Sequence, residues 1–304
     1  LDDASLGNIP VNIKITSVND GYHYENNEIS YLNLSINQKG FPVNGFSVKS
    51  SPIIFDVDNN NFSEIYFGTE GGDLFGFDFN GDQLANFPFS TGDKIRSSPA
   101  IGDVDNDGFD EIIFGSNDEN LYILSISGEL KLEYNASGAI YGSPALFDLD
   151  LDQDLEIIFT TQIGNNSGRL YAINDDGSNV TGFPIEVNEK MLVGAAVGDL
   201  ENDGIPEIVI CTWDNKIHVY NNDGMLKPGF PFYSTNRFNA PPSLIDVDND
   251  GYLEIIAGND SGLLHVINFD GSEFSSFDTG DDIRGGISSG DLNEDGSIEL
   301  LFSG

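Results

Sequence analysis

Six aspartates recur in one phase along the chain, and they constrain its fold more than any other feature of the sequence. Each opens an acidic loop, and neighbouring loops start about 45 to 51 residues apart: Asp56, Asp103, Asp148, Asp199, Asp246 and Asp291. Self-similarity with a period in the forties is typical of solenoids and propellers, in which every repeat is one small supersecondary unit. The sequence therefore predicts repeated units rather than one large core.

Every unit contains the same series of short apolar runs. In the second unit these are residues 98–102, 111–115 and 121–124, and a fourth, weaker run closes the unit. Gly, Asn and Asp separate the runs at roughly 8 to 12 residues per strand and turn, which indicates four-stranded antiparallel blades. A Phe-Pro pair recurs in the fourth run of four units, at Pro42, Pro88, Pro184 and Pro231. Because proline is tolerated mainly on edge strands, we expect an all-β propeller whose fourth strands form the outer edges.

The two ends of the chain carry complementary runs. Residues 29–48 resemble a third and a fourth run, whereas the sixth unit reaches Gly304 just after its second run. Pairing these ends would close the ring and remove two exposed sheet edges. This predicts a propeller of six blades over residues 29–304, with seven blades or part of a longer array as the alternatives. Residues 1–28 are then a linker or an extra N-terminal strand.

The charge balance limits the partners that the chain can have. It contains 51 Asp and Glu against 12 Lys and Arg, a formal net charge of -39 at pH 7. Such a field repels nucleic acid and anionic membranes, and no apolar stretch approaches the roughly 20 residues of a membrane span. We expect no nucleic-acid partner and no membrane insertion. The propeller is expected to be monomeric, either alone or as part of a larger multidomain protein.

The cysteine content bears on stability and on location. The one cysteine, Cys211, lies in the apolar run 208–211 and is expected to be buried as a small hydrophobic residue. Since no disulfide can form within the chain, its stability must come from packing and from bound metal. This favours an extracellular protein, secreted or held at the cell surface, in calcium-rich surroundings.

The acidic loops place oxygen-bearing side chains at positions 1, 3, 5 and 9. The second loop has Asp103, Asp105, Asp107 and Glu111, with Gly108 at position 6 where the chain must turn sharply. Three short carboxylates and one longer one can point to a common centre, and the carbonyl of position 7 completes the shell of six or more oxygens that calcium prefers. Magnesium demands a stricter octahedron and keeps its water, so it fits less well.

The same spacing predicts up to six calcium ions with a structural role. The candidate metal residues are Asp56, Asp58, Asn60, Phe62 and Glu64; Asp103, Asp105, Asp107, Phe109 and Glu111; Asp148, Asp150, Asp152, Asp154 and Glu156; Asp199, Glu201, Asp203, Ile205 and Glu207; Asp246, Asp248, Asp250, Tyr252 and Glu254; and Asp291, Asn293, Asp295, Ser297 and Glu299. A single Asp-rich turn is common without metal, but six copies in one phase favour it. Carboxylates clustered without a cation would repel one another, so bound ions should stabilise the fold.

Three features carry a family resemblance. They are the Ser-Ser-Pro lead-ins at 50–52 and 97–99, the loop 103–111, and the trailing Ile-Ile-Phe-Gly at 112–115. In these the chain resembles the FG-GAP/VCBS repeat family, the calcium-loop propeller repeats of integrin α-subunit heads and of many bacterial surface and secreted proteins, over residues 29–304. The resemblance implies calcium between the first two strands of each blade and a partner on the opposite face. It also implies seven or eight blades, against the six loops found here.

Cations gather in the loops expected on the face away from the calcium sites. Half of the 12 lie between a fourth run and the next first run: Lys49, Lys94, Arg96, Lys190, Arg237 and Arg284. With nearby aromatic residues they suggest a surface for an anionic or sugar-like ligand. Its candidate residues are Lys49, Lys94, Arg96, Tyr141, Trp213, Arg237, Phe238 and Arg284. The alternative is that these cations offset nearby carboxylates and that the aromatic residues fill the central funnel.

Nothing in the sequence points to a particular catalytic reaction. His218 and His265 occupy equivalent third runs, which favours strand positions over a catalytic dyad, and no nucleophile elbow, phosphate loop or zinc spacing is present. We therefore predict a calcium-stabilised binding or adhesion module for a glycan or protein partner, with no catalytic residue assigned. The alternative is a polysaccharide lyase or an accessory domain of a larger secreted enzyme, because some calcium propellers that resemble this chain are lyases.

Overall fold

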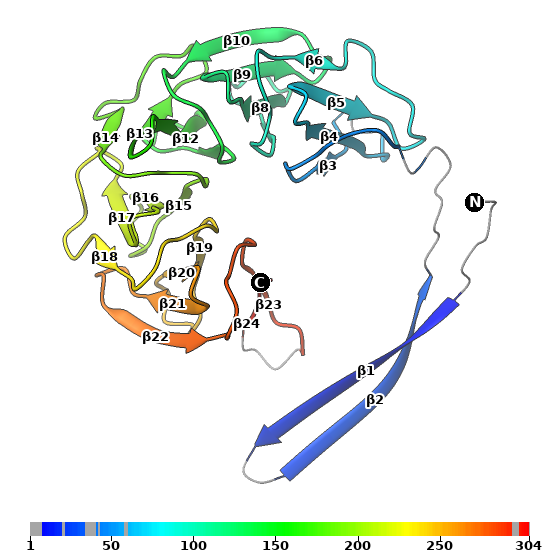
Figure 1. Cartoon of the computed structure of the whole chain (residues 1–304), viewed down its shortest axis with the longest axis vertical. Coiled ribbons are helices and arrows are strands. Elements are labelled where there is room, and N and C mark those ends of the chain that lie inside the picture. Colours follow the sequence, from blue (N-terminus) through cyan, green and yellow to red (C-terminus); the bar gives the residue numbers. More distant parts are fainter. Residues whose placement is uncertain are drawn as a thin grey trace.

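The computed structural model describes residues 8–19, 22–33, 41, 43–57, 60–293 and 298–303, with residues 8–33 described by their backbone alone. Five four-stranded antiparallel sheets and a two-stranded one follow one another in chain order around an open ring, in the manner of propeller blades (Figure 1). The prediction of an all-β chain of four-stranded antiparallel sheets is confirmed. No helix in the described part of the chain has the length and apolarity to cross a membrane.

The strands of the five complete sheets run four to a sheet. They are β3 (Ile53–Phe55), β4 (Glu64–Gly68), β5 (Asp73–Phe77) and β6 (Phe89–Ser90); β7 (Ala100–Gly102), β8 (Glu111–Gly115), β9 (Asn120–Ser125) and β10 (Leu130–Asn135); β11 (Ala145–Phe147), β12 (Glu156–Ile163), β13 (Ser167–Ile173) and β14 (Ile185–Val187); β15 (Ala196–Gly198), β16 (Glu207–Cys211), β17 (Lys216–Asn221) and β18 (Phe232–Tyr233); and β19 (Ser243–Ile245), β20 (Glu254–Gly258), β21 (Leu263–Ile267) and β22 (Glu273–Asp278). The two-stranded sheet consists of β23 (Ser288–Gly290) and β24 (Glu299–Leu301).

The order of strands within a sheet follows the order in the chain. The first strands β7, β11, β15 and β19 lie next to one another toward the middle of the ring, and the fourth strands lie at its outside (Figure 1). Pro88, Pro184 and Pro231 each directly precede a fourth strand at a sheet edge. The prediction that the fourth run is the outer edge is therefore confirmed for these sheets, and Pro42 lies outside the described residues.

The hydrophobic cores lie between neighbouring sheets. Successive side chains of a strand point to opposite faces, so adjacent residues enter different cores. On β8, Ile112 packs into the core shared with the sheet β3–β6, and Ile113 packs into the core shared with β11–β14. On β12, Ile157 packs into the core shared with β7–β10, and Ile158 packs into the core shared with β15–β18. The second strands therefore read as continuous apolar runs, because both of their faces are covered.

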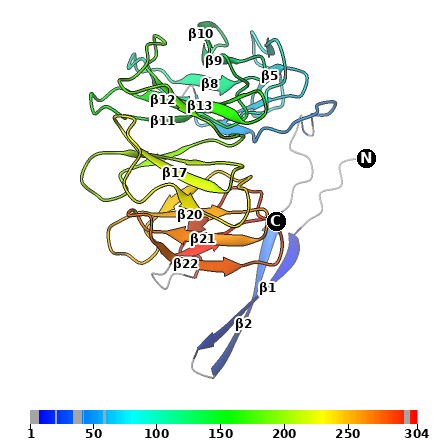
Figure 2. The same ribbon diagram turned by 60° about the vertical axis from the view of Figure 1, so that its left-hand side comes forward.

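The predicted closure of the ring by the two chain ends is wrong. Residues 29–33 belong to β2 (Tyr22–Asn33), which pairs along its whole length with β1 (Asn8–Asn19) instead of joining β24. The hairpin β1–β2 projects away from the other sheets in both views (Figures 1 and 2). Neighbouring segments pair at a lower loop-closure cost than segments from opposite ends of a chain, which favours this hairpin. The proposed domain boundary at residue 29 falls inside β2 and stays a prediction.

The segment 43–48, expected to complete a fourth strand, lies instead against the first sheet. Phe46 packs on Phe75 with 4.5 Å between ring centroids, and it also contacts Phe67 and Phe77. These three aromatic rings are on the face of the sheet away from β7–β10, because Tyr66 and Leu74 fill the core on the other side. The segment thus covers apolar surface that no complete sheet covers.

The backbone at the end of the second strand lies very close to the segment that leads into the next sheet. A β-carbon added to Gly115 would lie 2.1 Å from Ile140 Cγ2, and Gly68 and Gly258 make equivalent approaches to Ile95 and Ile283. We predict that Gly115→Ala lowers the free energy of unfolding by about 1–3 kcal/mol, because the core must shift to admit the methyl group. Urea denaturation measures this change. The matched control Gly286→Ala, where the nearest atom is at 3.9 Å, should stay within about 0.5 kcal/mol of wild type, and equal effects of the two substitutions would contradict the packing argument.

Candidate metal centre

The acidic loops join the first and second strands of the sheets and share one hydrogen-bond pattern. The carboxylate of Asp103 accepts hydrogen bonds from the backbone N–H of Asp107 at 3.1 Å and of Gly108 at 2.9 Å. The carboxylate of Glu111 accepts one from the backbone N–H of Val104 at 3.1 Å. The same bond from position 2 to the glutamate at position 9 is present in the other five loops, at 2.6 to 3.2 Å.

Two residues of the loop adopt a left-handed backbone. Position 6 has φ +89° at Gly108, +87° at Gly204 and +91° at Gly251, as the prediction of a sharp turn requires. Position 4 has positive φ as well, at Asn106, Leu151, Asn202 and Asn249. Asn and Gly tolerate this region, whereas other side chains are strained in it. The third loop carries that strain at both positions, because Leu151 has φ +68° and Gln153 has φ +84°.

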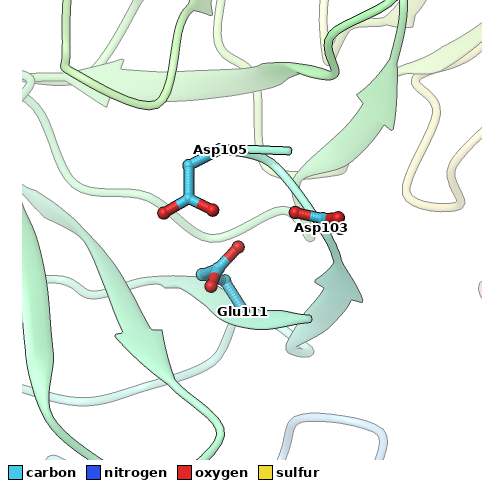
Figure 3. Close-up of side chains that lie close together, drawn as sticks. All are labelled: Asp103, Asp105 and Glu111. Atoms are coloured by element: carbon cyan, nitrogen blue, oxygen red, sulfur yellow. The ribbon is translucent and has the colours of Figure 1, made fainter. Parts of the chain in front are cut away.

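Three loops bring their carboxylates close together. Ligand atoms lie within 4.8 Å of one another in the groups Asp103, Asp105 and Glu111; Asp148, Asp150 and Glu156; and Asp246, Asp248 and Asp250. Figure 3 shows the first group, in which Asp105 and Glu111 point toward each other and Asp103 lies beside them. An arrangement of this kind can hold a cation through oxygen ligands, as predicted from the spacing.

The remaining candidate residues are less completely described. Asp58, Asp295 and Ser297 lie outside the described residues. In the first loop, Asp56 accepts hydrogen bonds from the backbone N–H groups of Asn60 and Asn61 in the same pattern as Asp103. Among the described residues, the fourth loop forms no close carboxylate group, and its Glu201 pairs with Lys227. The side chains at position 7 that are apolar, namely Phe62, Phe109, Ile205 and Tyr252, are exposed and leave only their carbonyls to serve as ligands.

The glutamate at position 9 is the most buried charge of the loop. Glu156 is 1% exposed, and burial together with the carboxylates of Asp150 and Asp152 raises its pKa to about 7, against hydrogen bonds from the backbone that lower it. Burial also raises the pKa of Glu254, with the carboxylates of Asp248 and Asp250 adding to the effect. In the same loop as Glu156, the Oδ1 atom of Asp148 is buried without a hydrogen-bond partner. A buried carboxylate with a raised pKa and a buried oxygen without a partner are what a cation site without its cation would show.

Two lysines that the sequence reasoning missed reach into acidic loops. Lys131 Nζ lies 2.8 Å from Asp105 Oδ2 and 2.5 Å from Glu111 Oε1, and Lys227 Nζ lies 2.7 Å from Glu201 Oε1 and 2.8 Å from Glu207 Oε1. Both lysines follow the glutamate at position 9 by 20 residues. That fixed spacing is a signal that alignment of the repeats could have revealed.

On the opposite face, the predicted ligand-binding cations are engaged with carboxylates. Arg96 donates two hydrogen bonds to Glu70, at 2.6 and 3.1 Å, and Lys94 lies 3.9 Å from the same group. Arg237 pairs with Asp260 at 2.5 Å, and Arg284 pairs with Asp282 at 2.5 Å. Lys49 is exposed.

The predicted aromatic residues of that face are less available than expected. Phe238 is fully buried in the core between the fourth and fifth sheets. Lys190 Nζ lies 3.5 Å from the centroid of the Trp213 ring, and the guanidinium carbon of Arg237 lies 4.4 Å from it. Tyr141 is half-buried, with Arg96 at 6.0 Å from its ring centroid. A ligand that stacked on Trp213 would have to displace its cations.

The same face contains a buried ionic cluster that the sequence did not indicate. The carboxylate of Glu189 accepts a hydrogen bond from Thr212 at 2.7 Å, lies 3.1 Å from His218 Nε2 and pairs with Lys216. Burial would raise the pKa of Glu189, but the hydrogen bonds from His218, Lys216 and Thr212 outweigh it and hold the pKa at about 2. His218 lies on β17 and His265 on β21, so the prediction of strand positions for both is confirmed.

The third loop provides a test of the local geometry. We predict that Gln153→Gly raises the free energy of unfolding by about 1 kcal/mol, because glycine adopts the left-handed region without steric cost. Leu151→Asn should act in the same direction through the same backbone preference. Thermal denaturation of each variant checks the sign, and Gln153→Ala serves as the control because alanine gains nothing at positive φ. A Gln153→Gly variant no more stable than Gln153→Ala would contradict the assigned conformation.

Comparison with known proteins identifies a repeat family in the part of the chain that contains the third, fourth and fifth acidic loops. Residues 148–210 and 199–257 match the family model described as FG-GAP-like repeat. Comparison with curated proteins gives no match. Among solved structures, BBS1N from its complex with ARL6DN is similar at 12% identity and a TM-score of 0.61, over 87% of this chain and 76% of that one.

Two bacterial structures are also similar. The V. cholerae biofilm matrix protein Bap1 matches at 18% identity and a TM-score of 0.58 over 76% of this chain, which spans 40% of the length of Bap1. The C-terminal domain of PilY1 from Pseudomonas aeruginosa matches at 16% identity and a TM-score of 0.56, over 71% of this chain and 60% of that one. At these identities the likeness concerns the fold. Residues 148–257, which contain the third, fourth and fifth acidic loops, are FG-GAP-like repeats.

Proposed function

We propose that this chain is a calcium-stabilised β-propeller that serves as a binding or adhesion module of a secreted or cell-surface protein. The observation that carries the proposal is the third acidic loop. Its carboxylates converge, Glu156 is almost fully buried, and Asp148 Oδ1 is buried without a partner. A buried carboxylate without a counter-charge is costly, so the loop needs a cation.

The donor set of the loop fits calcium. Asp148, Asp150 and Glu156 supply hard oxygen ligands, and the carbonyl of Asp154 stands at the position that the spacing assigns to a further ligand. A bound calcium ion would supply positive charge and no reaction chemistry. Its effect would be to cancel the repulsion among these carboxylates and to fix the first hairpin of the sheet. The fifth loop offers three carboxylates as well, those of Asp246, Asp248 and Asp250 at positions 1, 3 and 5.

The binding role rests on the fold and on the charged surface. Bap1 is a biofilm matrix protein, and this chain shares its fold over part of its length. On the face away from the acidic loops, Arg284 is 62% exposed and Arg96 is 31% exposed, each with carboxylates beside it. Paired guanidinium and carboxylate groups can recognise the hydroxyl groups of a glycan or the polar surface of a protein. We therefore place the partner on this face.

The calcium site is tested by removing its most buried carboxylate. In EGTA at about pH 8, Glu156→Gln should be more stable than wild type by roughly 1–3 kcal/mol, because the variant does not bury an uncompensated charge. With calcium the order should reverse, since the variant has lost a ligand. Thermal and urea denaturation in calcium and in EGTA measure both differences, and Glu129→Gln, at an exposed glutamate, is the control.

The pH dependence has a definite sign. The pKa of Glu156 is about 7 in the metal-free fold, above its ordinary value of 4.5. The native state therefore holds this proton more tightly than the unfolded state, and its contribution is lost as the pH rises from about 4.5 through 7. The advantage of Glu156→Gln in EGTA should vanish below about pH 4.5. An advantage that is independent of pH, or stability indifferent to calcium, would overturn the proposal.

The partner surface is tested by a binding screen. Glycan and protein arrays probed with calcium and again with chelator should identify a partner that binds only in calcium. Replacing Arg96 and Arg284 with alanine should weaken that binding about 10-fold or more, because each removes a charge-assisted hydrogen-bond donor. The control is Arg169→Ala, which removes an arginine of the third sheet that pairs with Glu186 of the same sheet. Unchanged binding by the Arg96 and Arg284 variants would exclude this face.

A further inference from the structure

Lysines from the segment after the third strand occupy two of the acidic loops. In the second sheet, Lys131 Nζ lies 2.8 Å from Asp105 Oδ2, 2.5 Å from Glu111 Oε1 and 3.5 Å from Asp107 Oδ2. In the fourth sheet, Lys227 Nζ lies 2.7 Å from Glu201 Oε1 and 2.8 Å from Glu207 Oε1. The ammonium groups therefore contact the side chains at positions 3 and 9, two of the four that would hold an ion.

The two lysines stand at one structural position of the repeat. Each is the third residue after the glycine of the turn that ends the third strand, Gly128 and Gly224. The backbone N–H of Lys227 donates to the carbonyl of Val219, as the N–H of Leu84 does to Gly76 in the first sheet and that of Val180 does to Ala172 in the third. Phe274 is the corresponding residue of the fifth sheet, three residues after Gly271. The first, third and fifth sheets therefore have a side chain without an amino group at this position.

A tethered ammonium and a calcium ion compete for the same oxygens. The carboxylates of Glu111 and Glu207 are 1% and 3% exposed, so neither can turn to solvent to leave room for a second cation. Two cations held by one small group of oxygens would repel each other strongly in such a site. The lysine is covalently attached, so it competes at a high effective concentration and a calcium ion must displace it.

The difference between the loops is visible in their buried atoms. In the third loop, where Val180 replaces the lysine, Asp148 Oδ1 is buried without a partner. In the fourth loop, Glu207 is paired with a lysine whose side chain is 8% exposed. The buried glutamate of the fourth loop thus has a counter-charge within the chain, whereas the buried oxygen of the third loop has none.

We propose that the acidic loops are of two kinds: in the second and fourth sheets the ammonium groups of Lys131 and Lys227 occupy part of the oxygen site, so these loops hold calcium weakly or not at all, whereas the loops of the third and fifth sheets, which lack this lysine, hold it tightly. The inference deepens the proposed function, on which it rests, by assigning the ions to particular loops. Lysine and calcium would then alternate around the ring. The number of tightly bound ions is smaller than the six that the repeat count predicts.

The test is calcium stoichiometry in lysine variants of the full chain. Lys131→Met and Lys227→Met keep the length of the side chain and remove its charge. By isothermal titration calorimetry and equilibrium dialysis, each should bind about one more calcium ion than wild type, and the double variant about two more. Lys94→Met, at a lysine near Glu70 on the other face, should leave the count unchanged. Variants that bind the same number of ions as wild type would overturn the inference.

Melting temperatures give a second readout. In EGTA, Lys227→Met should lower the melting temperature by roughly 5–10 °C, because Glu207 is left buried without a counter-charge. Saturating calcium should restore most of that loss. A loss that calcium does not restore would show that the lysine only packs, which contradicts the competition.

The reverse substitution covers the case in which the methionine variants fold only with calcium. Val180→Lys places an amino group at the same position of the third sheet, and it should remove about one bound ion. Retention of the wild-type count by a folded Val180→Lys variant would contradict the inference. If wild type binds calcium but no variant changes the count, this inference fails and the proposed function stands. If wild type and every variant bind no calcium, both fail.

Discussion

Repulsion among the carboxylates in the acidic loops is the constraint that the rest of the structure must satisfy. Each of the first five loops buries one glutamate at the start of a second strand, where its carboxylate fixes the backbone of the loop, and surrounds it with further acidic side chains. The buried position is favourable for the turn and costly for the charge. In a chain with a net charge of -39, cations relieve this conflict: lysine ammonium groups come from the chain itself, and the acidic loops could bind metal ions.

The repeat itself explains how far the sequence could predict the fold. Within a unit, strands, turns and edge prolines are set by local patterns, so the four-stranded sheets and the outer edge at Pro88, Pro184 and Pro231 were predictable. The closure of the ring was not, because it depends on competition between partners far apart in sequence. Residues 29–33 have the pattern of a third strand, yet β2 pairs with its neighbour β1. A pattern specifies a strand without specifying its partner.

The candidate site, too, was predictable where neighbouring residues determine it and not where distant segments meet. The spacing of Asp103, Asp105 and Glu111 predicted their convergence, since nine consecutive residues control it. It could not show that Lys131 comes from another strand to the same carboxylates, nor that Lys190 and Arg237 lie over the ring of Trp213. Phe238 was expected on the surface and is buried, because its neighbours in space come from two different sheets. These features arise from contacts between repeats.

The two faces of the ring differ physically: one carries the clustered carboxylates of the acidic loops, and the other carries paired guanidinium and carboxylate groups. The most direct measurement is a long-wavelength anomalous difference map from crystals grown in calcium. We expect calcium peaks among the carboxylates of Asp148, Asp150 and Glu156 and of Asp246, Asp248 and Asp250, and ammonium groups without a peak at Lys131 and Lys227. Loops without any peak, with their carboxylates clustered as they are here, would contradict the account.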